Sequence, residues 1–133
     1  MRLHRDESGM VGKIIVIWLL LVALLGVVAI DTASIVFTKF RLSDTAQTAA
    51  TAAAVSYQSA HSVQAACTAA AQSVAVADEH LKFPAGACKI DTSTGEVTIV
   101  LRKDANTIVA GRLSFTQDLT KVVQKETAGP SSL

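Results

Sequence analysis

Near its start the chain has a long run of hydrophobic residues that no charge interrupts. Residues 14–30 read IIVIWLLLVALLGVVAI, with one glycine and no proline. As an α-helix the stretch 10–30 rises about 31 Å, enough to cross a hydrocarbon core of about 30 Å. Lys13 then lies near one boundary and Asp31 at the other, with Trp18 about one turn inside the Lys13 end. The pattern predicts one membrane-spanning helix.

From Leu42 the hydrophobic run gives way to alanines and small polar residues. Alanine is the strongest helix former, and no glycine or proline occurs between Val27 and Phe83. Small or apolar residues recur there in steps of three and four, which marks one helical face. They are Leu42, Ala46, Ala50, Ala53, Tyr57, Ala60, Val63, Cys67, Ala70, Val74, Ala77 and Leu81. We therefore predict one nearly continuous helix over residues 11–81.

This stripe of small residues needs a partner, since a helix cannot bury its own face. Two partners are possible: the protein's own sheet, or helices of other subunits, because small side chains let a second backbone approach closely. We expect the membrane-proximal part of the stripe to be a helix–helix packing face that lies above the sheet. Its residues are Leu42, Ala46, Ala50 and Ala53.

Strand-like patterns fill the C-terminal part. Residues 87–92 and 96–103 flank the tetrad TSTG, a turn-like sequence that ends in Gly95. Residues 119–128 predict a third, edge-like strand, and residues 108–115 fit either a short helix or a loop. The expected fold class is α+β, a long helix packed on a small antiparallel sheet of about three strands.

The charged flanks predict the orientation of the span. Arg2, Arg5 and Lys13 precede it, and this favours a cytoplasmic N-terminus. The expected organisation is a cytoplasmic segment 1–9, a transmembrane helix and exit 10–37, an extracytoplasmic helix and sheet 38–129, and a tail 130–133. The alternative is a signal peptide cut after Ala29, although the apolar run exceeds a typical signal of about 7–15 residues.

Two cysteines, Cys67 on the stripe and Cys88 at the first strand, suggest a disulfide. An extracytoplasmic compartment permits oxidation, and the alternative is two buried free thiols. Two thiols without a neighbouring ligand supply only half a metal site. Asp31 has two interpretations. It marks the outer membrane boundary, or it pairs with a cation on a neighbouring transmembrane helix.

The composition narrows the function. The 133 residues carry a net charge of +1 and six aromatic residues (one Trp, one Tyr and four Phe), so no basic, aromatic surface for nucleic acid is expected. No nucleophile–base pair, phosphate loop or carboxylate dyad can be recognised. We expect a protein that is not an enzyme, with no cofactor, no metal and no small-molecule substrate.

The first half of the chain resembles the TadE/TadG-like proteins of bacterial Flp (Tad) pilus systems. The resemblance is carried by RDESG at residues 5–9, the apolar run, and AIDTASIVFTKFRLSDTAQTAATAAA at residues 29–54. The C-terminal half, with a cysteine before a strand and TIVAGRL ahead of the last strand, is similar to actinobacterial members. Pilin-type processing would cut after Gly9, a possible processing site, but the glutamate expected five residues later is Ile14 here, so we do not predict cleavage there.

The resemblance implies a membrane-anchored minor pilin-like or assembly component. Its partners would be the lipid bilayer of the plasma (inner) membrane and other pilus or secretion-machinery proteins, including pilin-like subunits. Two alternatives remain: a secreted soluble binding domain released by a signal peptidase, and a generic single-pass envelope protein.

Overall fold

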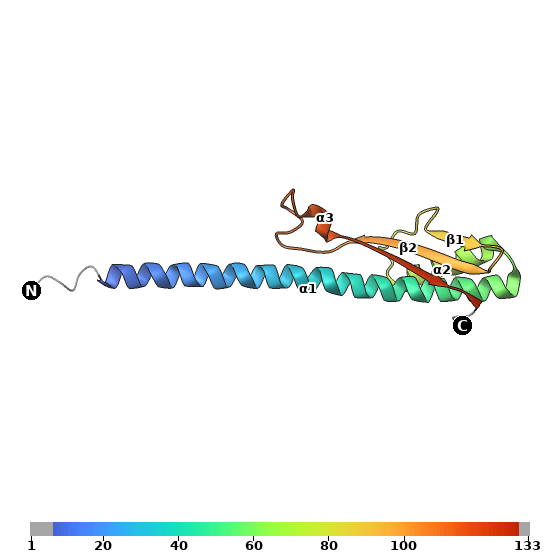
Figure 1. Cartoon of the computed structure of the whole chain (residues 1–133), viewed down its shortest axis with the longest axis horizontal. Coiled ribbons are helices and arrows are strands. Elements are labelled where there is room, and N and C mark those ends of the chain that lie inside the picture. Colours follow the sequence, from blue (N-terminus) through green and yellow to red (C-terminus); the bar gives the residue numbers. More distant parts are fainter. Residues whose placement is uncertain (1–6, 131–133) are drawn as a thin grey trace, which may run out of the picture.

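A computed structural model describes residues 7–130 of the chain. One helix, α1 (Glu7–Ala60), runs straight through 54 residues, and the remaining elements gather along its C-terminal half (Figure 1). Arg2 and Arg5, much of the predicted cytoplasmic segment and residues 131–133 of the predicted tail lie outside the described residues. The helix begins before the predicted residue 11, and Gly9 lies in its first turn.

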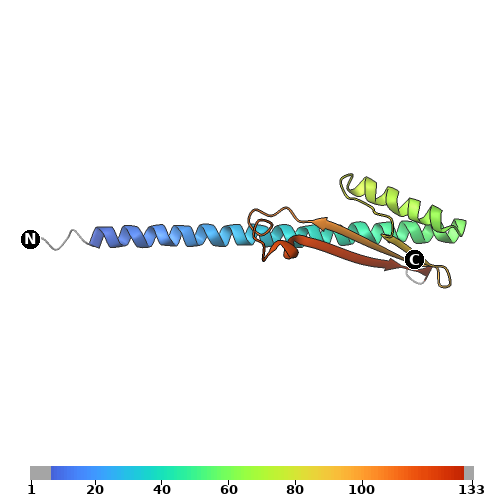
Figure 2. The same ribbon diagram turned by 90° about the horizontal axis from the view of Figure 1, so that it is seen from above.

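The predicted continuous helix to residue 81 is wrong. The chain turns back after Ala60, and α2 (Val63–Ala77) runs beside α1 in the opposite direction (Figure 2). Two residues make the turn. His61 adopts a left-handed backbone with φ of 50°, and its N–H donates to Tyr57 O. Ser62 then caps α2, its side chain accepting from the N–H of Ala65. Folding back lets α2 bury Ala66, Ala70 and Val74, which an extended helix would leave in solvent.

Three antiparallel strands follow, β1 (Cys88–Asp91), β2 (Glu96–Asp104) and β3 (Lys121–Ala128), in the order β1-β2-β3. The tetrad at residues 92–95 joins β1 and β2 as predicted. Gly95 takes a φ of 74° there, a conformation that favours glycine. The alternation along β2 buries Val97, Ile99 and Leu101. β3 is an edge strand, also as predicted.

The sheet forms one layer and the α1–α2 hairpin the other, with β2 and β3 over α1 and β1 toward α2 (Figures 1 and 2). This is the expected α+β fold. The helical side of the core is built mostly from alanines, which let the sheet and α2 approach α1 closely. The core residues are Leu42, Ala46, Ala49, Ala50, Ala53, Ala54, Ala66, Ala70, Val74, Val97, Ile99, Leu101, Ala105, Val122 and Ala128.

The connection from β2 to β3 returns toward the N-terminal half of α1 (Figure 1). Residues 106–116 form a chain of turns and bends, and α3 (Gln117–Thr120) is a single helical turn before β3. We refer to residues 106–116 as the β2–β3 loop. Of the two conformations left open for residues 108–115, the structure has the loop.

Candidate functional site

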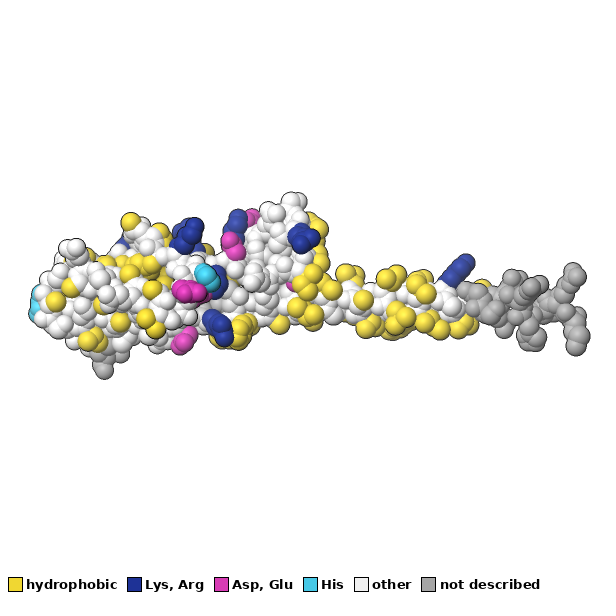
Figure 3. All heavy atoms as spheres, turned by 180° about the vertical axis from the view of Figure 1, so that it is seen from behind, with side chains coloured by type: hydrophobic (Ala, Val, Ile, Leu, Met, Phe, Trp, Pro, Cys, Tyr) yellow, Lys and Arg dark blue, Asp and Glu magenta, His cyan; other side chains and the backbone are white. Residues whose placement is uncertain are grey.

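The N-terminal half of α1 projects beyond the domain, and no other part of the described chain covers it. Between Met10 and Ile30 its apolar side chains are exposed except for the half-buried Val27. Trp18 is 65% and Leu20 66% exposed, and these side chains cover the projecting rod in Figure 3. Only 6% of its most apolar 18-residue window is buried. By length and composition, α1 can cross a membrane. Such an exposed apolar surface is costly in water and is the kind that a bilayer or another protein covers.

Asp31 lies where the bare helix meets the folded domain. It is only 6% exposed, and its carboxylate accepts three consecutive backbone N–H groups from the β2–β3 loop. Ile108 donates to Oδ1 at 2.6 Å, while Val109 and Ala110 donate to Oδ2 at 2.9 and 2.8 Å. One helix turn farther along α1, the hydroxyl of Ser34 donates to the carbonyl of Asn106. These contacts fasten the loop to α1 at the end of the apolar run.

The predicted pairing of Asp31 with a cation on another helix finds no support in this arrangement. The loop amides already occupy both carboxylate oxygens, and charge-assisted hydrogen bonds of this kind are strong. The boundary position expected for Asp31 remains compatible with its place at the end of the apolar run. Sequence spacing could not reveal the amides, because they lie 77 to 79 residues away.

The predicted disulfide is present. Cys67 of α2 and Cys88, the first residue of β1, are bonded, with Cα atoms 5.8 Å apart. The bond ties the helical layer to an edge strand of the sheet. No free cysteine remains in the chain.

The predicted packing face for other subunits is wrong. Ala46, Ala50 and Ala53 are 0% exposed and Leu42 is 2% exposed, all inside the protein's own core. The sheet reaches farther along α1 than the sequence analysis assumed, because β2 and β3 are long and run antiparallel to each other over α1. The small residues do serve helix–helix packing, but between α1 and α2 of one chain.

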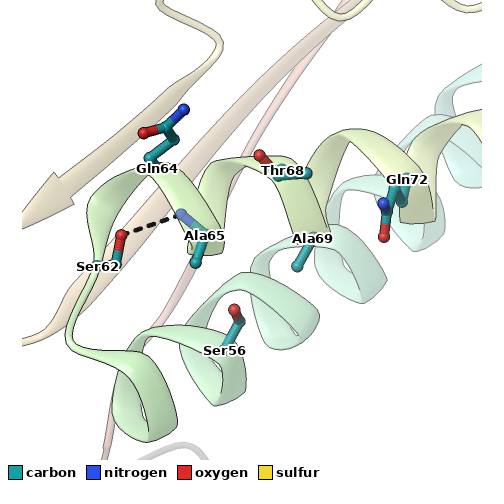
Figure 4. A pocket seen from close by; sticks show the side chains of 7 residues that line it. All are labelled: Ser56, Ser62, Gln64, Ala65, Thr68, Ala69 and Gln72. Carbon is teal, nitrogen blue, oxygen red and sulfur yellow. Dashed lines mark hydrogen bonds between the residues drawn. The ribbon is translucent and has the colours of Figure 1, made fainter.

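The surface grooves of the described residues show no catalytic constellation. One shallow groove of about 490 Å³ lies between α1 and α2 near their turn, and alanines and short polar side chains line it (Figure 4). A second groove, of similar volume, lies near the other end of the hairpin and carries Arg41, Asp44, Asp78, Lys103 and Asp104. Within residues 7–130 no group of three potential metal ligands converges.

Asp78, which follows α2, is hydrogen-bonded to the sheet. Asp78 accepts a hydrogen bond from the ammonium of Lys103 on β2, and its Oδ1 accepts the N–H of His80. The hydrogen bond from Lys103 lowers the pKa of the Asp78 carboxyl below its ordinary value. Glu79 and His80 contact each other with both side chains exposed, as expected for the end of a helix.

An apolar surface that was not predicted from the sequence lies on the β2–β3 loop and α3. Ile108, Val109, Leu113, Phe115 and Leu119 expose 39–79% of their surface. Their irregular spacing fits neither a helix nor a strand, so periodicity could not assign them to a face.

Comparison with protein-family models, curated proteins and solved structures found no match.

Proposed function

We propose that the protein is a membrane-anchored, non-catalytic subunit of a Flp (Tad)-type pilus or a related secretion system. The observation that supports it most is the bare half of α1, in which the uncharged apolar run at residues 14–30 continues without a break into the core of a small domain. One helix would then serve both as anchor and as scaffold.

In this proposal the N-terminus lies in the cytoplasm and the domain outside the plasma (inner) membrane. The basic flank before the span supports that orientation. The Cys67–Cys88 bond supports it independently, since disulfides persist in oxidising compartments.

Cysteine labelling tests the orientation. Ser8→Cys lies before the span, and Thr92→Cys lies in the exposed β1–β2 turn. In intact cells a membrane-impermeant maleimide should label Thr92→Cys and leave Ser8→Cys unlabelled until the membrane is permeabilised. The native cysteines are bonded to each other and serve as the unlabelled control. The reverse labelling pattern would exclude the proposed topology.

Co-purification tests the assembly role. A tagged full-length chain, extracted from its native membranes in mild detergent, should retain pilin subunits or the membrane proteins of the secretion platform. A matched control keeps residues 31–133 and carries an unrelated apolar helix in place of residues 10–30. Recovery of the chain without pilus or secretion proteins in the wild-type sample would count against the assembly role and leave the anchoring intact.

A second candidate is a secreted domain released after Ala29. One observation favours it: of the residues described as buried, the first along the chain is Asp31, so such a cut would leave the whole core in the released part. N-terminal sequencing of the mature protein separates the two. Retention of residues 10–30 supports the anchor, and a mature chain that starts at Ile30 supports secretion.

A further inference from the structure

We propose that the β2–β3 loop and α3 dock into the outer interface of the same bilayer that α1 crosses. The proposal rests on the anchoring by α1 proposed above. Five apolar side chains carry it: Phe115 is 79% exposed, Leu119 66%, Ile108 54%, Leu113 40% and Val109 39%. Hydrophobic atoms gather on the edge of the domain that faces the bare helix in Figure 3.

The loop lies at the depth of the outer membrane boundary. The hydrogen bonds of Ile108, Val109 and Ala110 to Asp31 hold the loop beside the end of the apolar run. If the hydrocarbon core covers residues 10–30, Asp31 lies at its outer edge. Alternatively, Lys13 and Lys39 mark the two headgroup layers, since 26 residues rise about 39 Å against a total bilayer thickness of about 40–45 Å. Asp31 then lies within the outer half of the bilayer. Both placements bring the loop into contact with lipid.

The backbone N–H groups of the loop have hydrogen-bond partners within the protein. Irregular backbone is tolerated at membrane depth only where its polar groups find partners within the protein. Five consecutive N–H groups of the loop meet this condition. Residues 108–110 donate to Asp31, Gly111 donates to the hydroxyl of Thr107, and Arg112 donates to the carbonyl of Val109. The loop therefore turns its amides inward to Asp31 and its own chain while its apolar side chains face outward.

The apolar surface of the loop is continuous with that of α1. The apolar surface of α1 runs to Ile30, and the apolar loop lies beside the next residue, so one hydrophobic surface extends from the helix onto the domain. Arg112 is exposed within the same loop, where its guanidinium can reach lipid phosphates. These features indicate that the lipid interface covers the apolar surface of the loop.

Tryptophan fluorescence in vesicles tests the proposal on the full-length chain. Trp18 is the only tryptophan, so the wild type reports on α1. The double variant Trp18→Phe/Phe115→Trp reports on the loop, and Trp18→Phe/Val55→Trp is a matched control, because Val55 is 53% exposed and about 36 Å beyond Asp31 on the same helix. Each protein is reconstituted in phosphatidylcholine–phosphatidylglycerol vesicles that carry nitroxide labels either near the headgroup or deep in the acyl chains.

For the Phe115→Trp protein, the expected result is a blue-shifted emission that loses most of its intensity to the shallow label and little to the deep label. The Val55→Trp control should keep its fluorescence with both labels. If Trp18 of the wild type is quenched and the indole introduced at position 115 is not, the loop stays out of the bilayer and the docking proposal is overturned, while the anchor stands. In that case the apolar loop would be a surface for a protein partner. If neither is quenched, the anchor itself fails.

Folding of the variants is checked by circular dichroism and by formation of the Cys67–Cys88 bond. Should Phe115→Trp disturb the fold, Leu113→Trp in the same Trp18→Phe background repeats the measurement from a second position on the loop. An unquenched indole at position 113 in a folded protein overturns the proposal equally.

Discussion

At the scale of single residues, His61 makes the turn between the helices at an energetic cost. Its φ of 50° places a side chain with a Cβ in the left-handed region, where glycine is preferred at the end of a helix. His61→Gly should therefore raise the free energy of unfolding by about 1 kcal/mol. The measurement is thermal unfolding of the full-length protein in detergent, with an expected rise of about 4–8 °C for a domain of this size.

His61→Ala is the matched control for that variant. It removes the ring, which lies 6.2 Å from that of Tyr57, but it keeps the Cβ and its strain. It should melt at or slightly below the wild-type temperature. A glycine variant that melts no higher than the alanine variant would show that the left-handed backbone carries no measurable strain.

Asp78 gives the domain part of its sensitivity to acid. The Lys103 hydrogen bond lowers the carboxyl pKa in the folded state, so the folded protein holds this proton less tightly than the unfolded chain. The pair stabilises the fold above the unfolded pKa of about 4, and this contribution is lost as pH falls through the lower folded value. Both side chains are partly exposed, so the effect is at most about 1 kcal/mol.

Asp78→Asn should lower stability at pH 7 and flatten its dependence on pH below about 4. Denaturant unfolding at several pH values measures both effects. Glu79→Gln is the neighbouring control: Glu79 is 83% exposed on its side chain, and its removal should leave the profile unchanged. A profile of Asp78→Asn that runs parallel to the wild type would contradict the assigned role.

At the scale of elements, the alanines of α1 set how closely α2 and the sheet can pack. Ala50 is 0% exposed, and Ala50→Leu would insert three carbon atoms into a filled interface, at a cost of about 1–3 kcal/mol. Gln47→Leu places the same leucine side chain on an exposed face of the same helix and should cost much less. Melting of both variants in detergent tests this, and equal melting temperatures would mean that the interface around Ala50 can expand freely.

The disulfide stabilises the fold by closing a loop of the chain, which lowers the conformational entropy of the unfolded state. Its cysteines are 21 residues apart, and the chain-entropy relation gives about 3 kcal/mol for a loop of this length. Cys67→Ser/Cys88→Ser should lose about that much stability. Reduced wild-type protein should lose a similar amount, while reductant should not affect the variant. Wild-type stability that is insensitive to complete reduction would contradict the assignment.

The sequence predicted those elements whose signals are local. The apolar run, the alternation of Val97, Ile99 and Leu101, and Gly95 each identify their own secondary structure. The break at His61 was missed, because no glycine or proline signals it and burial of α2 decides it. The amides that bind Asp31 were missed for a related reason. Residue identity does not show which backbone N–H groups will bind a carboxylate. Only tertiary packing defines these parts of the fold and of the site.

At the scale of the whole molecule, the apolar segment at residues 10–30 and the folded domain share one helix but do not pack on each other. Residues 10–30 contribute no buried side chain to the core. A chain that begins at residue 30 should therefore fold, stay soluble without detergent and melt within a few degrees of the full-length protein. Size-exclusion chromatography and circular dichroism check this. Aggregation of the truncated chain would show that the bare helix supports the fold, or that the apolar loop alone needs a lipid surface.

The uninterrupted course of α1 from Glu7 to Ala60 has a mechanical consequence. The helix is unbroken at Asp31, where the loop contacts brace it. If residues 10–30 span a membrane as proposed, a change in their tilt therefore turns the domain with them. From Asp31 to Ala60 the helix rises about 44 Å. A tilt of about 20°, common for membrane helices, would swing its far end sideways by about 15 Å. Bilayer thickness and neighbouring membrane helices would set this tilt. They would thereby determine the position at which the His61 turn can contact another protein.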